Sequence, residues 1–207
     1  MTITLVGILL ILGFGFFLYK PIRKYHDYLY LAAVIASIVS FTLETTIINM
    51  GYLGLSFFIV VMFVTVLEKS EIKKRLMGIR AELAIIGSIF AITHGLKFIV
   101  FSIDFNFFWE APLYFYIGIA SVVIMLPLTI TSFMMIRKTI KGKTWKKLHQ
   151  LSYLFYVLVG VHLILIQNDR LWFYSVIFGA YVLMKGWELI QKSRKDSKQI
   201  GKIKPAV

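Results

Sequence analysis

The 207-residue sequence contains no cysteine, only four prolines and only ten acidic residues. Without cysteine the chain can form no disulfide and no thiolate metal site, and it cannot ligate an iron–sulfur cluster. Charged residues make up 16% of the chain, whereas a typical soluble domain has about 25%. Hydrophobic residues make up 59%, and the mean hydropathy is +0.81. These proportions exclude an ordinary soluble domain and indicate a chain that lies in a membrane.

Long apolar segments account for most of the chain. Each has about 18 residues or more, which is enough to cross a bilayer as a helix. The seven predicted spans lie at residues 2–19, 28–48, 52–68, 81–101, 114–136, 148–167 and 171–190. They leave about 67 residues in short pieces, too few for a separate domain that binds a nucleotide or a flavin. We therefore expect an all-α integral membrane protein built as a bundle of seven transmembrane helices.

The position of the charges gives the orientation of the chain. Basic residues outnumber acidic ones by 23 to 10, and 20 of the 23 lie in every second connection or after the last span. The other connections hold Asp104, Glu110, Asp169 and Arg170. The positive-inside rule then predicts an outside N-terminus and a cytoplasmic C-terminus, which seven spans satisfy. The basic residues are thus expected at the cytoplasmic membrane surface, and nucleic-acid binding is not expected. The first span lacks a basic n-region and a cleavage site, so we expect a retained helix.

Two histidines lie deep within apolar spans, where an ionisable side chain is costly and is by default a functional candidate. His94 follows the cytoplasmic Arg80 by fourteen residues, and His162 follows Lys147 by fifteen. At a rise of about 1.5 Å per residue, both imidazoles lie about 21–22 Å from the cytoplasmic side. The fourth and sixth spans run in the same direction, so the two histidines share one depth and can ligate one metal from opposite faces.

This pair of imidazoles is typical of bis-histidine heme b, whose ring is apolar. A zinc or copper site normally requires more ligands, and the sequence offers no third ligand at this depth. Gly95 and Gly160 adjoin the two histidines and are expected to leave room for a flat ring. Three alternatives remain open: a structural hydrogen bond between helices, a proton relay in a small transporter or channel subunit, and a subunit that docks a redox protein without a cofactor.

Arg80 and His149 form a second candidate site near the cytoplasmic side. On an ideal helix Arg80 faces within about 40° of His94, whereas His149 points about 140° away from His162. A second heme on His149 therefore needs a tilt, a bulge or another partner. Arginine is a poor iron ligand, but it suits a heme propionate, a flavin phosphate or a quinone carbonyl. The alternative is that this basic pair meets lipid phosphates.

For three further polar residues we expect a structural role. His26 is expected to be a solvated residue at the membrane boundary. Glu44 is expected to form a cap or an interface contact, with a proton or propionate role as the alternative. Lys97 lies three residues past His94. It is expected to extend to the outer surface, with a salt bridge to a heme propionate as the alternative.

With these residues in place, residues 51–190 resemble the ferric reductase-like transmembrane domain superfamily. The similarity is greatest to its MsrQ-type (YedZ-like) branch, the heme-binding membrane subunit of the periplasmic methionine sulfoxide reductase system. The motifs that carry the resemblance are residues 80–83 leading to His94, residues 126–132, residues 142–154 and His162. A Trp-x-x-Leu-His sequence followed by a second histidine thirteen residues later is the most specific of these signals.

The resemblance implies a six-helix core, with the first span at residues 2–19 as an extra helix before it. The expected division of the chain is two N-terminal transmembrane helices in residues 1–50, the ferric reductase-like heme-binding core at residues 51–190 and a basic cytoplasmic tail at residues 191–207. It implies that His94 and His162 are axial ligands of a heme b, and that Arg80 and His149 mark a cytoplasmic-side cofactor site for a second heme, FMN or a quinone. Larger relatives carry four heme histidines, and here Arg80 stands where the fourth would fall.

The implied function is electron transfer across a bacterial-type cytoplasmic membrane. The donor would be a cytoplasmic flavin reductase or a membrane quinol, and the acceptor an extracytoplasmic reductase, such as a methionine sulfoxide reductase, or a ferric acceptor. Because six-coordinate iron has no open position for substrate, no catalytic residue is expected in this chain.

Overall fold

The structure, a computed structural model, describes residues 2–43, 51–166 and 171–203, with side chains described as far as residue 194. Throughout these segments every regular element is a helix, as the sequence predicts. The helices are α1 (Thr2–Phe17), α2 (Tyr19–Lys24), α3 (His26–Leu43), α5 (Tyr52–Val66), α6 (Glu71–Gly78), α7 (Arg80–Asp104), the short 3-10 helix η1 (Phe108–Glu110), α8 (Leu113–Ile130), α9 (Met134–Arg137), α10 (Gly142–Leu148), α11 (Leu151–Leu165) and α12 (Leu171–Ile203).

Five helical segments are long and apolar enough to cross a membrane. They are His26–Leu43, Arg80–Asp104, Leu113–Ile130, Gly142–Leu165 and Leu171–Arg194. The chain is therefore a multi-pass membrane protein. Helices α1 and α5 coincide with the two other predicted spans, but they have only 16 and 15 residues. Because an upright span needs about 20 residues, the count of seven spans stays a prediction.

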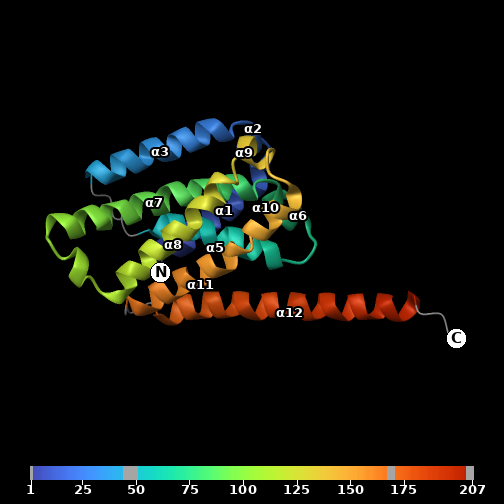
Figure 1. The fold of residues 1–207 in the computed structure, drawn as a ribbon. Helices are drawn as coiled ribbons and strands as arrows, with labels where there is room; N and C mark the ends of the chain where they lie inside the picture. Colours follow the sequence, from blue (N-terminus) through green and yellow to red (C-terminus); the bar gives the residue numbers. More distant parts are fainter. Residues whose placement is uncertain (1, 44–50, 167–170, 204–207) are drawn as a thin grey trace.

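Helix α5 lies in the middle of the bundle and packs against α1, α7 and α12. Its sequence is apolar all round, which is typical of a helix that is buried on every face. Met62 and Val64 accordingly have exposed fractions of 0% and 1%. Figure 1 shows α3 running along α7 at one edge of the bundle and α12 running along the opposite edge. The elements that carry the candidate site residues, α7 and α11, lie between these two edges.

The main apolar core joins α5, α8, α11 and α12 in the interior. Phe58 of α5 meets Phe155 of α11 edge to face, with ring centroids 4.8 Å apart. Met125 of α8 and Tyr181 of α12 complete this cluster. Burial of such side chains stabilises soluble proteins by about 1.5–3 kcal/mol each, but between helices in lipid the gain comes from close contact instead. The core therefore fixes the relative positions of α8 and α11.

Helix α1 docks on this bundle through glycines. A Cβ added to Gly7 would lie 2.6 Å from Oγ of Ser56, and a Cβ added to Gly15 would lie 2.6 Å from Leu76. The hydroxyl of Ser56 also donates a hydrogen bond of 3.2 Å to the carbonyl of Thr4. Small residues at a helix interface allow this close approach.

The structure differs from the predicted spans at the end of α8, which stops at Ile130 although the apolar run continues to residue 136. The hydroxyl of Thr131 donates to the carbonyl of Pro127 at 2.6 Å, and that of Ser132 donates to the carbonyl of Leu128 at 2.7 Å. Side-chain bonds of this kind compete with the backbone ladder and favour helix ends. The turn that follows directs α9 and α10 across the end of the bundle.

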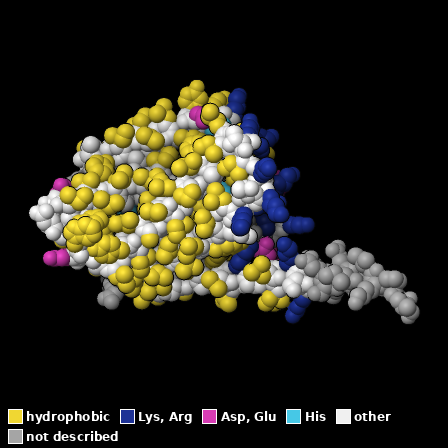
Figure 2. Space-filling view, viewed as in Figure 1, with side chains coloured by type: hydrophobic (Ala, Val, Ile, Leu, Met, Phe, Trp, Pro, Cys, Tyr) yellow, Lys and Arg dark blue, Asp and Glu magenta, His cyan; other side chains and the backbone are white. Residues whose placement is uncertain are grey.

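Lysine and arginine side chains gather at one end of the molecule, where α6, α9 and α10 lie, whereas hydrophobic side chains cover its flanks (Figure 2). Helix α12 runs past this end to Ile203, beyond the predicted boundary at residue 190. We call this the basic end. That the basic end lies on the cytoplasmic side remains a prediction from the positive-inside rule.

Candidate functional site

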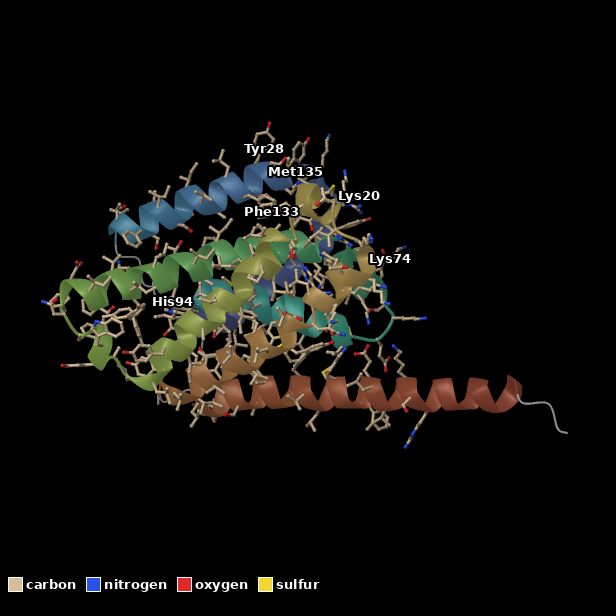
Figure 3. The ribbon with its side chains drawn as sticks, in the orientation of Figure 1. Lys20, Tyr28, Lys74, His94, Phe133 and Met135 are labelled. Carbon is tan, nitrogen blue, oxygen red and sulfur yellow. The ribbon has the colours of Figure 1, made fainter. Side chains whose placement is uncertain are left out.

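His94 lies in α7 and His162 in α11, and both are half-buried. Helix α8 packs against both of these helices and lies between them in Figure 1. Figure 3 shows His94 in the half of the bundle away from Lys20 and Lys74, which belong to the basic end. The depth of His94 in a bilayer stays a prediction. It also stays a prediction that one macrocycle binds to both imidazoles through its iron.

The imidazole of His162 is held by α8. Its Nδ1 lies 2.8 Å from the backbone carbonyl oxygen of Tyr114. Because a carbonyl can only accept, Nδ1 is the donor, and the lone pair of Nε2 is then free to bind a metal. The ring reaches this carbonyl over Gly118, where an added Cβ would lie 2.9 Å from Cε1 of His162. Because Gly118 has no Cβ, the surface of α8 leaves a recess at this position that the ring of His162 occupies.

The imidazole of His94 rests on a glycine in the same way. Gly51 precedes α5 with a φ of +70°, a left-handed conformation that favours glycine. A Cβ there would lie 3.2–3.3 Å from three atoms of the His94 ring. The ring also meets Phe98 edge to face, with centroids 5.0 Å apart. Each candidate ligand therefore has one glycine of a neighbouring helix against its ring.

The glycines that adjoin the histidines in sequence face neighbouring helices. A Cβ on Gly95 would meet Val122 of α8 at 3.3 Å, and a Cβ on Gly160 would meet Phe178 of α12 at 3.4 Å. That they leave room for a flat ring stays a prediction. Residues next to a ligand in a helix point about 100° away from it, so the space beside the ligand is set by other helices.

These contacts fit a heme held by two imidazoles. The flanking helices present glycines at both histidines, and the tautomer of His162 leaves Nε2 available. Among the described residues, no group of three or more His, Cys, Asp or Glu side chains is placed to hold a bare metal ion. Two nitrogen ligands suffice for a heme iron, whose other four ligands come from the porphyrin.

Arg80 and His149, the second predicted pair, line one cavity of about 580 Å³. Both are half-buried, Arg80 at the start of α7 and His149 between α10 and α11. Further cations line the same cavity: Arg23, Arg137 and Lys138. The structure therefore brings together the two residues that the sequence paired at the basic end. The volume is in the range of about 300–1,000 Å³ that is usual for small-molecule sites.

The ring of His149 is fixed by two neighbours, Trp145 and Thr131. It stacks on Trp145 with centroids 4.0 Å apart, and its Nε2 lies 3.1 Å from the hydroxyl of Thr131. Trp145 in turn donates a 3.0 Å bond from Nε1 to the carbonyl of Thr131, and the guanidinium of Arg137 covers its ring at 4.6 Å. Because His149 is the C-cap of α10, the angle expected for one continuous helix does not apply.

Sequence reasoning missed Glu82 and the contribution of the N-terminal helices. Glu82 has an exposed fraction of 7% and lines the cavity from the first turn of α7. Tyr30 of α3 lines it from another side, with its ring 5.6 Å from that of Phe133. A lone carboxylate two residues after Arg80, at the start of an apolar span, was the available signal for Glu82. Nothing in the sequence paired α3 with this site.

The three secondary candidates lie as follows. His26 is half-buried and donates from Nδ1 to the carbonyl of Arg23 at 3.0 Å, and it also lines the cavity. The Nζ of Lys97 is buried 5.9 Å from the ring centroid of Phe41, so it does not extend to the surface as predicted. Glu44 lies outside the described residues.

Comparison with known proteins places this geometry in context. Residues 45–160 match the family described as ferric reductase like transmembrane component. An uncharacterized protein of Treponema pallidum (strain Nichols) is 29% identical, in an alignment that covers 81% of this chain and 55% of the relative. The chain therefore spans about half the length of the curated relative that it matches. The family match includes Arg80, His94 and His149 and ends two residues before His162.

Proposed function

The chain belongs to the family of ferric reductase-like transmembrane components, and from this membership we propose that it transfers electrons across a membrane through one b-type heme. His94 and His162 would hold the iron. The observation that carries the proposal is the 2.8 Å contact between Nδ1 of His162 and the Tyr114 carbonyl, because an imidazole fixed in this way presents Nε2 to a metal.

The heme would supply a one-electron carrier between the two sides of the membrane. With His94 and His162 both holding it, the iron would have no position open to oxygen or to a substrate. The carbonyl of Tyr114 fixes the tautomer of His162, and Gly118 and Gly51 leave room for the two rings. The protein is thus an electron-transfer subunit of an oxidoreductase system, and it does not itself hold the nicotinamide or the substrate.

Electrons would enter at the cavity lined by Arg80 and His149. Its cations suit the phosphate of a flavin or the carbonyl of a quinone. A second heme is less well supported there, because Nε2 of His149 is bonded to Thr131 and Arg80 is not an iron ligand. We therefore propose a single heme, with FMN or a quinone carried by the cavity.

The direction of transfer follows the charge distribution. The basic end would face the cytoplasm of a bacterial-type cell and receive electrons from a flavin reductase or from membrane quinol. The half with His94 would face the outside and pass electrons to an extracytoplasmic reductase or a ferric acceptor. A methionine sulfoxide reductase is the acceptor that the MsrQ-type resemblance indicates.

The test is a reduced-minus-oxidised absorption spectrum of the purified protein in detergent. We expect a heme b signal that is lost in His94→Ala and in His162→Ala and retained in the control His26→Ala. A signal that persists unchanged in both ligand variants would overturn the ligand assignment. A protein without heme, whose pH-dependent ion flux is lost in His94→Ala, would instead support the proton-relay alternative.

A further inference from the structure

Glu82 is a largely buried carboxylate that lines the cavity, with Tyr30 of α3 as an electrostatic neighbour. Its exposed fraction is 7%, and it forms no hydrogen bond or ion pair with any described residue. The dipoles at the start of α7 favour a negative charge in this turn, which explains why the charge is tolerated. Its oxygen atoms are not among the fully buried polar atoms that lack a partner, so they reach the open space of the cavity.

The side chain of Glu82 borders the cavity at the basic end. The floor of this cavity is apolar, with Met125 and Leu128 of α8 and Phe155 of α11. Flat rings line its sides, among them the stacked pair of Trp145 and His149. Such a lining accepts a planar, largely apolar ring system. A ligand in this cavity can therefore offer hydrogen-bond donors to Glu82 in place of water.

The groups near Glu82 restrict which ligand atoms fit. Arg80 is always a donor, so it requires an acceptor such as a carbonyl or a phosphate oxygen. The Glu82 carboxylate is an acceptor, so it requires an O–H or N–H and repels a carbonyl. A ring that carries donors at one edge and acceptors at another satisfies both residues.

We infer that Glu82 makes the cavity selective for the reduced form of a two-electron, two-proton ring carrier, an inference that rests on electron entry at this cavity. A quinone has only carbonyl acceptors, whereas its hydroquinone has two O–H donors. A flavin likewise gains N–H donors at N1 and N5 on reduction. In both cases the reduced form differs by two electrons and two protons, and the added protons turn ring acceptors into donors: the two oxygens of the quinone, or N1 and N5 of the flavin, whose N3–H is present in both forms.

This selectivity serves the direction of transfer. The reduced carrier binds more tightly than its oxidised product, so the product leaves once it has lost its donors. The wall of the cavity that comes from α2 and α3, with Arg23 and Tyr30, lies outside the family match at residues 45–160. The N-terminal helices thus complete a site that the matched segment alone leaves open.

The experiment measures binding of probes that do not readily exchange single electrons, under anaerobic conditions, to the full chain in nanodiscs by equilibrium dialysis, so that it does not depend on a heme. One pair is 1,3-dihydroxynaphthalene and its dimethyl ether, which differ only in the two O–H donors. The other pair is 1,5-dihydro-5-deaza-FMN and 5-deaza-FMN, which differ by ring donors. We expect the donor-bearing member of one pair to bind about tenfold more tightly. The naphthalene pair would identify a quinol source, and the deazaflavin pair a flavin source.

The variant Glu82→Gln keeps the shape of the side chain but offers both a donor and an acceptor, so it should still bind and should lose the preference. Glu71→Gln is the matched control, because it removes one carboxylate from the exposed α6 at the same end, outside the cavity. Equal binding within both pairs, or a preference that survives in Glu82→Gln, would refute the inference. Either result leaves the heme assignment intact, since that rests on separate spectra.

Discussion

The imidazole of His162 reaches the backbone of α8 only because residue 118 is glycine. Its Nδ1 lies 2.8 Å from the Tyr114 carbonyl, while an added Cβ at Gly118 would lie 2.9 Å from Cε1 and 3.1 Å from Nδ1 of the same ring. This single contact sets the tautomer and the rotation of the proposed ligand. It therefore links the sequence of α8, which carries no proposed ligand of its own, to the chemistry of the site.

Gly118→Ala should displace the His162 ring. The methyl group would break the bond to the Tyr114 carbonyl, and loss of such supporting contacts weakens metal sites by about 10–100-fold. We expect lower heme retention on dilution, together with a changed low-spin electron paramagnetic resonance spectrum of the oxidised protein, which reports ligand-plane orientation.

The matched control for this substitution is Gly179→Ala in α12, where an added Cβ would meet nothing within 4 Å. Both changes raise helix propensity by about 1 kcal/mol, so folding alone does not separate them. An unaltered resonance spectrum and heme content in Gly118→Ala would show that the ring does not depend on this recess.

His149→Ala should leave the heme content at one per chain. The Nε2 of His149 is engaged by Thr131, so this residue is not needed as an iron ligand. Loss of the bond and of the Trp145 stack should lower the free energy of unfolding by about 1–2 kcal/mol. Heme-to-protein ratios and thermal melts measure the two effects. A fall to half of the wild-type heme content would reveal a second heme at this cavity.

Gly7→Leu should separate α1 from α5 without affecting the heme. A Cβ at this position would lie 2.6 Å from Oγ of Ser56, and overfilled contacts cost about 1–3 kcal/mol. We expect earlier unfolding in a denaturant titration and an unchanged absorption spectrum, because the predicted core begins at residue 51. Gly13→Leu is the control, since a Cβ there has nothing within 4 Å. Heme loss in folded Gly7→Leu would instead place α1 in the functional core.

Several features could be predicted from the sequence because they depend on local order along the chain. The apolar runs predicted a helix at the place of every span, and the charge of the connections predicted the basic end. The spacing of His94 from Arg80 predicted its depth. The end of α8 was predicted incorrectly. Hydropathy values take no account of the hydrogen bonds that the hydroxyls of Thr131 and Ser132 donate to carbonyls of the preceding turn.

Sequence by itself thus determined the class of the protein and its helices, since hydropathy acts residue by residue, whereas the common depth of the two histidines stays a prediction from helical rise. Only the tertiary structure decided which glycines lie against the imidazoles, that Glu82 lies buried in the cavity with Arg80 and His149, and that α3 closes it. These are contacts between helices. They depend on how the side chains of separate segments pack together, and the residue pattern within one segment does not predict this packing.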